Sequence, residues 1–121
     1  MGQLEGKIAL VTGSSRRIGK AIAIAFAKEG ANLVLAARGA DGLNATAEAI
    51  KALGCDVEVV PSDVQIEAEI DNLFKKTMAR FGRLDILVNN SGVFAGGPID
   101  KIKTEDWDNV IATNLRAPFL C

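Results

Sequence analysis

Short, uniformly apolar runs alternate along the chain with stretches whose apolar residues recur every three or four positions. The apolar runs predict strands at about 7–12, 32–37, 56–60 and 85–88. Their continuous apolar character is typical of parallel strands that are covered on both faces. The periodic stretches predict helices at about 17–29, 43–52 and 65–81, and another that begins near residue 104. Strands and helices therefore alternate, which favours a doubly wound parallel α/β sheet with right-handed crossovers.

The predicted helices carry apolar stripes and end signals. The stripes comprise Ile18, Ile22, Ala25 and Phe26 in the first helix, and Ile66, Ile70, Leu73, Phe74, Thr77 and Phe81 in the third. A glycine follows each of the first three predicted helices, at Gly30, Gly54 and Gly82. Asp41 is the predicted N-cap of the second helix. A loop with Gly96, Gly97 and Pro98 precedes the last helix.

The 121 residues suffice for one domain, residues 1–121. The last eight positions resemble the start of a further helix. Its apolar residues, Leu115, Phe119 and Leu120, have no apolar partner later in the sequence. The strand at 85–88 lacks a covering neighbour as well, and a free strand edge invites pairing with another chain. We therefore expect a truncated domain that forms a homo-oligomer or aggregates.

Composition and charge exclude several classes of function. The net charge is −1, which gives no electrostatic basis for nucleic-acid binding. No apolar run approaches the roughly 20 residues that cross a bilayer, and residues 1–10 lack the apolar stretch of a signal peptide. Cys55 and Cys121 are far apart and lack metal-ligand spacing, which fits a reducing compartment. We expect a cytoplasmic protein with no metal site and no membrane partner.

The segment from Ile8 to Gly19, IALVTGSSRRIG, is the most informative part of the chain. It predicts a strand, a glycine-bearing turn and a helix, an arrangement that directs free amide hydrogens and the positive end of the helix dipole at a pyrophosphate. Gly13 permits the tight turn, and Gly19 lets the helix approach the sheet closely. Ser14 and Ser15 could donate hydroxyls to phosphate or cap the helix, and the sequence leaves both roles open.

Four motifs in this order resemble those of the short-chain dehydrogenase/reductase family, most closely its ketoacyl-reductase and sugar-dehydrogenase members. The first motif, Thr12-Gly13-Ser14-Ser15-Arg16-Arg17-Ile18-Gly19, is similar to the T-G-x-x-x-G-x-G cofactor loop except at one position. The other three are Asp63-Val64, Asn89-Asn90-Ser91-Gly92 and Asn114. The resemblance covers the whole chain but only about the N-terminal half of a family member. It implies half of a Rossmann sheet, with four parallel strands in the order 3-2-1-4 and helices on both faces.

The resemblance also implies roles for these residues. The loop from Gly13 to Gly19 would hold the cofactor, and Asp63 would contact its adenine. Asn90, Ser91 and Gly92 would lie near the nicotinamide ribose. Asn114 would belong to the catalytic set and hold a water on a proton relay. Asp63 could also cap the helix that follows it.

The charge after the second strand bears on the choice of cofactor. An NAD-specific site usually places Asp or Glu there to accept hydrogen bonds from the ribose hydroxyls. This chain has Ala37 followed by Arg38 instead, and Arg16 lies in the glycine loop. Two guanidinium groups could pair with a 2′-phosphate, which favours NADP(H) over NAD(H). The alternative is that Arg38 is solvated and Asp41 accepts the ribose.

The chain departs from the family pattern in two ways. Arg17 stands where the family has its middle glycine, and we expect its side chain to crowd the cofactor and weaken binding. The Tyr, Lys and Ser that the resemblance implies for catalysis lie beyond this segment in family members, and the 121 residues contain neither Tyr nor His.

We therefore expect the cofactor-binding portion of an NADP(H)-dependent oxidoreductase, inactive by itself, whose substrate would be a small carbonyl or alcohol. One alternative is a non-catalytic dinucleotide-binding or oligomerising module. The other is a fragment of a longer active protein.

Overall fold

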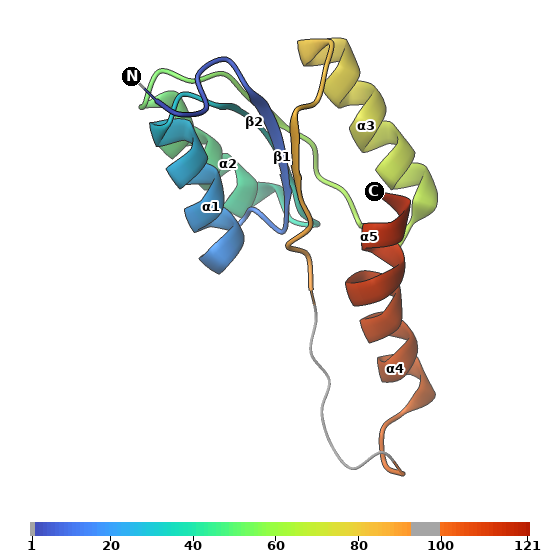
Figure 1. The fold of residues 1–121 in the computed structure, drawn as a ribbon. Coiled ribbons are helices and arrows are strands. Elements are labelled where there is room, and N and C mark those ends of the chain that lie inside the picture. The colour runs from blue at the N-terminus through green and yellow to red at the C-terminus, as the bar shows by residue number, and fades with distance from the viewer. Residues whose placement is uncertain (1, 93–99) are drawn as a thin grey trace.

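The protein is described by a computed structural model that covers residues 2–92 and 100–121. Four strands form one parallel sheet in the order β3-β2-β1-β4 (Figure 1). They are β1 (Ile8–Thr12), β2 (Asn32–Ala36), β3 (Val57–Val59) and β4 (Ile86–Val88). In the central pair, Ile8 is opposite Asn32 and Thr12 is opposite Ala36. The predicted fold and strand order are confirmed. The loop predicted around Gly96, Gly97 and Pro98 lies outside the described residues.

Helices cover both faces of this sheet because its strands are apolar on both sides. The helices α1 (Arg17–Lys28) and α2 (Ala40–Lys51) lie on one face, and α3 (Glu67–Phe81) lies on the other (Figure 1). Successive residues of β2 face opposite sides of the sheet, so one strand contributes to the packing on both faces. Leu33 and Leu35 pack with the residues of α1 and α2, whereas Val34 packs with Leu73 of α3. A continuous apolar strand is what this two-sided burial requires.

The apolar stripe predicted for α1 is confirmed only in part, because Ile22 and Phe26 pack against the core but are not the most buried residues of the helix. The buried residues of this helix are Gly19, Ala23 and Ala27, which recur every four positions. Ile18 is 67% exposed and Ala25 is exposed too. Small residues on the buried face let the helix lie close to the sheet, so this face is selected by side-chain size rather than by hydrophobicity.

Two predicted helix caps are wrong. The helix α2 begins at Ala40, with Gly39 as its N-cap, so Asp41 lies inside the first turn. Its carboxylate there still interacts favourably with the positive end of the helix dipole. The helix α3 begins at Glu67, with Ile66 as its N-cap, and no side chain bonds that end. Asp63 therefore does not cap α3.

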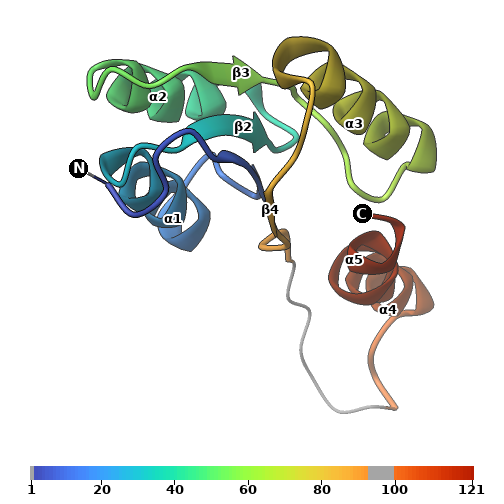
Figure 2. The ribbon, with the colours of Figure 1, turned by 45° about the horizontal axis from the view of Figure 1, so that its top comes forward.

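The remaining helices form one continuous stretch beside α3. They are α4 (Thr104–Ile111), the π-helix η1 (Ala112–Arg116) and α5 (Ala117–Leu120), and Figure 2 shows them on the side of the sheet that α3 covers. Leu115 and Phe119 are 66% and 85% exposed, as the absence of apolar partners predicted. Leu120 instead packs against Val64 and Ile70, which precede it in the sequence. No helix in 2–92 or 100–121 has the length and apolar character to cross a membrane.

Candidate functional site

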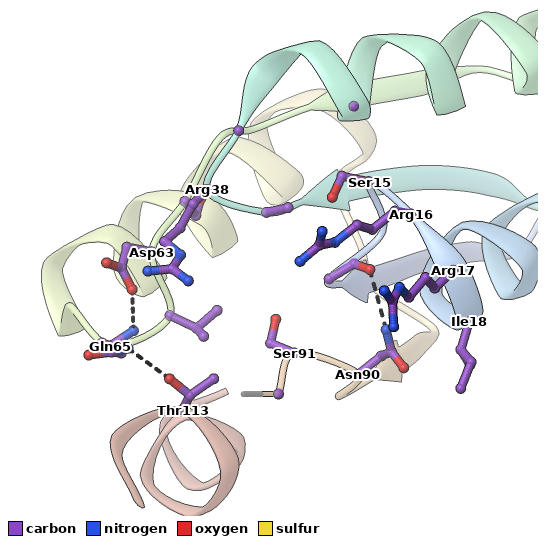
Figure 3. Close-up of a pocket in the computed structure, with 17 residues that line it drawn as sticks. Ser15, Arg16, Arg17, Ile18, Arg38, Asp63, Gln65, Asn90, Ser91 and Thr113 are labelled. Atoms are coloured by element: carbon purple, nitrogen blue, oxygen red, sulfur yellow. Dashed lines mark hydrogen bonds between the residues drawn. The ribbon is translucent and has the colours of Figure 1, made fainter. Parts of the chain in front are cut away.

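A cavity of about 620 Å³ opens at the carboxyl ends of the strands (Figure 3). Its walls come from the loops that follow each of the four strands and from η1. The lining residues are Gly13, Ser15, Arg16, Arg17, Ile18, Ala37, Arg38, Gly39, Gly42, Ser62, Asp63, Val64, Gln65, Asn90, Ser91, Gly92 and Thr113. Ligands of open α/β sheets bind at this edge, and the volume suits a small-molecule or cofactor ligand.

The glycine loop after β1 is held by close backbone packing. Gly13 has a φ of +66°, which side chains resist, and its amide donates to the Ala36 carbonyl oxygen at 2.8 Å. A Cβ on Gly13 would lie 3.1 Å from Nδ2 of Asn90, and a Cβ on Gly19 would overlap the Gly13 carbonyl oxygen. The side-chain amide of Asn90 donates through Nδ2 to that same oxygen at 3.3 Å. Both predicted glycine roles, a tight turn and a close helix, thus have a visible steric reason.

The two serines of the loop have different surroundings. Ser14 is fully buried, and its Oγ accepts a hydrogen bond from the Ala36 amide at 3.1 Å. Its carbonyl oxygen accepts from the Thr46 hydroxyl at 3.0 Å, so Ser14 faces β2 and α2 rather than the cavity. Ser15 lines the cavity. Arg16 is the N-cap of α1 and no side chain bonds that helix end, so the alternative that a serine caps α1 is wrong.

The Thr12 hydroxyl joins the ends of β1 and β4, a role that the sequence analysis missed. Its Oγ1 accepts hydrogen bonds from the amides of Asn90 and Ser91, at 3.0 and 3.1 Å. It lies 3.4 Å from the Val88 carbonyl oxygen, to which it donates. This bonding fixes the Asn89–Gly92 turn at the rim of the cavity. A threonine at the end of an apolar strand was the only available signal.

Three arginines give the cavity its charge. The side chains of Arg16, Arg17 and Arg38 extend into it, and Arg16 and Arg38 approach from opposite sides (Figure 3). Asp63 is the one acidic residue among those that line it. Asp41, the alternative ribose acceptor, is not among the lining residues. The lining is therefore suited to an anion.

Arg17 has an unusual backbone conformation. Its φ is +53°, and within 2–92 and 100–121 no other non-glycine residue has a positive φ. L-residues other than glycine pay roughly 1–2 kcal/mol for the left-handed conformation. Glycine would therefore suit this position for two reasons: it adopts a positive φ readily, and it has no side chain to crowd the cofactor. The arginine in place of the family's glycine predicted only the crowding of the cofactor, not the positive φ.

The loop that follows β3 forms a second wall. Asp63 folds the loop locally, since its Oδ1 accepts the Gln65 amide at 2.9 Å. Val64 is buried below the loop, in a cluster with Ile70. Nε2 of Gln65 donates to Oγ1 of Thr113 at 2.8 Å, which links this wall to η1 (Figure 3). Gln65 and Thr113 were not predicted, because neither residue type marks a site by itself.

Asn114 lies at the border of the cavity. It is exposed on η1 and is not among the lining residues, although its neighbour Thr113 is. Its Oδ1 lies 3.4 Å from the position that a Cβ on Gly92 would occupy. The structure thus brings the predicted catalytic asparagine beside the turn after β4.

These features together define a class of protein. A parallel sheet with a cavity at its carboxyl edge, and a glycine loop that leads into a helix N-terminus, form a Rossmann-type dinucleotide-binding domain. The family model for short chain dehydrogenases matches residues 7–121. The chain therefore belongs to the short chain dehydrogenases, oxidoreductases that bind a nicotinamide cofactor.

Known relatives agree with this assignment. The chain is 40% identical over 116 residues to the 3-oxoacyl-(acyl-carrier-protein) reductase FabG of Staphylococcus aureus strain N315, covering 95% of this chain and 47% of that protein. It is 38% identical over 118 residues to the (2S)-((R)-hydroxy(phenyl)methyl)succinyl-CoA dehydrogenase subunit BbsD of Thauera aromatica, covering 98% of this chain and 48% of that subunit. The chain thus spans about half the length of these curated relatives.

Solved structures share the fold. A metagenomic short-chain oxidoreductase in complex with NADP is 42% identical, with a TM-score of 0.92 over 97% of this chain and 53% of that one. A Serratia marcescens short-chain dehydrogenase/reductase mutant is 37% identical, with a TM-score of 0.93 over 97% of this chain and 48% of that one.

Proposed function

We propose that the cavity binds NADP(H) in preference to NAD(H), and that the chain is the cofactor-binding portion of an oxidoreductase for a small carbonyl or alcohol. The observation that carries this proposal is the approach of Arg16 and Arg38 from opposite sides of one cavity. Ala37 occupies the place of the usual acidic residue, so no carboxylate at that position repels a phosphate. A 2′-phosphate adds up to about two negative charges near neutral pH, and planar guanidinium groups pair well with it.

The residues present fit such a cofactor, and each is assigned a part of it. The pyrophosphate would lie at the start of α1, the 2′-phosphate between Arg16 and Arg38, and the adenine against Asp63 and Val64. The nicotinamide ribose would lie near the turn after β4. The proposed binding residues are Gly13, Ser14, Ser15, Arg16, Arg17, Ile18, Gly19, Arg38, Asp63, Val64, Asn90, Ser91 and Gly92. Of these, Ser14 and Gly19 act by shaping the loop, and Arg17 adjoins the cofactor but is expected to crowd it. When bound, the nicotinamide supplies or accepts a hydride.

Titration with NADPH and with NADH tests the preference. We expect NADPH to bind at least about tenfold more tightly, because hydrogen bonds to charged groups contribute about 1.5–3 kcal/mol. Arg38→Ala should remove most of this advantage and leave the NADH affinity unchanged. Lys28→Ala is the matched control, because it removes a positive charge from the last turn of α1. Equal affinities of the unsubstituted chain for the two cofactors would contradict the proposal.

The 121 residues themselves should not catalyse turnover. They contain no tyrosine and no histidine, and the proposed role of Asn114 is to hold a water rather than to transfer the proton. With NADPH and a small ketone, the chain should show no NADPH oxidation above the rate in buffer. Sustained oxidation that Asn114→Ala abolishes would overturn this expectation.

A second candidate function is that of an oligomerising module. The exposed side chains of Trp107, Leu115 and Phe119 lie on the α4–α5 stretch, and β4 is an edge strand whose residues are half-buried. Largely exposed apolar side chains on one helical stretch, together with a strand at the edge of the sheet in the part of the chain that the structure describes, favour association with another chain. This function is compatible with cofactor binding, since the cavity lies at the carboxyl edge of the sheet.

A further inference from the structure

The helical stretch from Thr104 to Leu120 contacts the part of the protein that contains the sheet at the loop that follows β3. Ala117 packs there in one cluster with Val64 and Ile70. Figures 1 and 2 both show the α5 end of the stretch near α3. Two of the polar contacts between the two parts involve one residue of the loop, Gln65, and Nη2 of Arg116 also forms an ion pair with Oε2 of Glu67 in α3 at 3.6 Å.

Gln65 bonds the stretch through both its side chain and its backbone. Its Nε2 donates to Oγ1 of Thr113 at 2.8 Å, and its carbonyl oxygen accepts from Nη1 of Arg116 at 3.2 Å. Its own amide donates to Asp63 Oδ1 at 2.9 Å, so the residue is anchored within the loop as well. Thr113 is only 5% exposed, and water therefore competes poorly for this bond.

This contact lies between the cavity and Asn114. Asp63, Val64, Gln65 and Thr113 all line the cavity, and Figure 3 shows Gln65 bonded to Asp63 on one side and to Thr113 on the other. The residue after Thr113 is Asn114, which lies beside Gly92 on the opposite wall. The two hydrogen bonds of Gln65 thus link Asp63 in the loop to Thr113 in η1.

We propose that Gln65 is a positioning residue that couples occupancy of the cavity to the placement of Asn114. The inference rests on the proposed binding of NADP(H) by the same cavity. A ligand that contacts Asp63 and Val64 restricts the motion of the loop, and the bond from Gln65 to Thr113 extends that restriction to η1. Asn114 is thereby held beside Gly92 when the cavity is filled and is less restrained when it is empty.

Amide hydrogen exchange of the whole 121-residue chain, with and without NADPH, tests this coupling. Thr113→Val keeps the shape of the side chain but cannot accept the bond, whereas Thr113→Ser keeps the hydroxyl. Gln65→Ala removes the donor, and Gln3→Ala is its matched control because Gln3 is an exposed glutamine that does not line the cavity.

Without ligand, Thr113→Val and Gln65→Ala should each speed exchange over residues 113–120 by about fivefold, the effect of losing one net hydrogen bond. The double variant should add nothing further, since both changes remove the same contact. With NADPH, exchange over 13–19 should slow in every variant. Exchange over 113–120 should slow only where the bond is kept, that is, in the unsubstituted chain, Thr113→Ser and Gln3→Ala.

Two results would overturn the inference. One is equal exchange over 113–120 in Thr113→Val and Thr113→Ser. The other is an equal slowing of that segment by NADPH in both variants. Failure of NADPH to slow exchange over 13–19 in the unsubstituted chain would instead contradict the proposed function, and the ligand-free comparison would then decide whether Gln65 holds the stretch.

Discussion

At the scale of single residues, the cavity combines an anion-binding composition with one unfavourable backbone position. Arg16 and Arg38 supply charge without visible strain, whereas Arg17 supplies charge from a φ of +53°. The family pattern has glycine at this position, and both the backbone conformation and the space above it account for that choice. Substitutions at Arg17 can therefore distinguish the effect of its charge from the effects of its backbone conformation and side-chain size.

Arg17→Gly should tighten NADP(H) binding, because it removes both the side chain over the pyrophosphate position and the backbone strain. Arg17→Ala is the informative partner variant, since it removes the guanidinium but keeps a Cβ at a positive φ. In urea denaturation, the glycine variant should be more stable than the alanine variant by about 1–2 kcal/mol. A titration in which Arg17→Gly binds NADPH no better than the unsubstituted chain would refute the crowding argument.

At the scale of elements, β1 is connected to β4 at both ends by single side chains. Thr12 holds the turn after β4 at the carboxyl edge. At the other edge, Oδ2 of Asp85 accepts hydrogen bonds from the Ile8 amide at 2.8 Å and from Nε of Arg83 at 3.1 Å. The Ile8 bond chiefly, with help from the Arg83 and Lys7 charges, lowers the pKa of the Asp85 carboxyl below its usual value of 3.8.

This lowered pKa predicts a pH dependence of stability. The ionised carboxylate is favoured in the folded state, so its contribution is fully present above the unfolded pKa near 3.8 and is lost as the pH falls through the lower folded value. Asp85→Asn should therefore be less stable than the unsubstituted chain at pH 7. The difference between the two should shrink below pH 4. Urea denaturation at several pH values measures it, and a difference that stays constant down to pH 2 would disprove the linkage.

At the scale of the whole molecule, the alternation of strands and helices in a parallel sheet could be predicted from local apolar patterns and the handedness of crossovers, whereas the strand order was implied by the family resemblance. The cavity could be predicted in outline, because its wall residues follow strand ends. The bond between Gln65 and Thr113 could not, since it joins residues 48 positions apart whose types carry no signal. The buried face of α1 was missed because small residues, rather than large apolar ones, make the closest contact with the sheet.

Self-association is a property of the whole molecule that the exposed α4–α5 stretch predicts. Light scattering at micromolar concentration should report a dimer or larger species. Replacing Leu115 and Phe119 together by Glu should reduce it to a monomer, because both side chains are largely exposed and so available to a partner. Leu53→Glu is the control, as Leu53 is also exposed but follows α2. A sharp monomer peak for the unsubstituted chain would contradict this prediction.

An amide-resolved NMR titration of the chain with NADPH and then with NADH tests most directly whether this cavity binds NADP(H). We predict saturable shifts at Gly13, Ser15, Asp63 and Gly92, which come from the loops after β1, β3 and β4, and saturation by NADPH at a lower concentration than by NADH. Shifts confined to other residues, or none at millimolar NADPH, would show that this cavity is not a dinucleotide site.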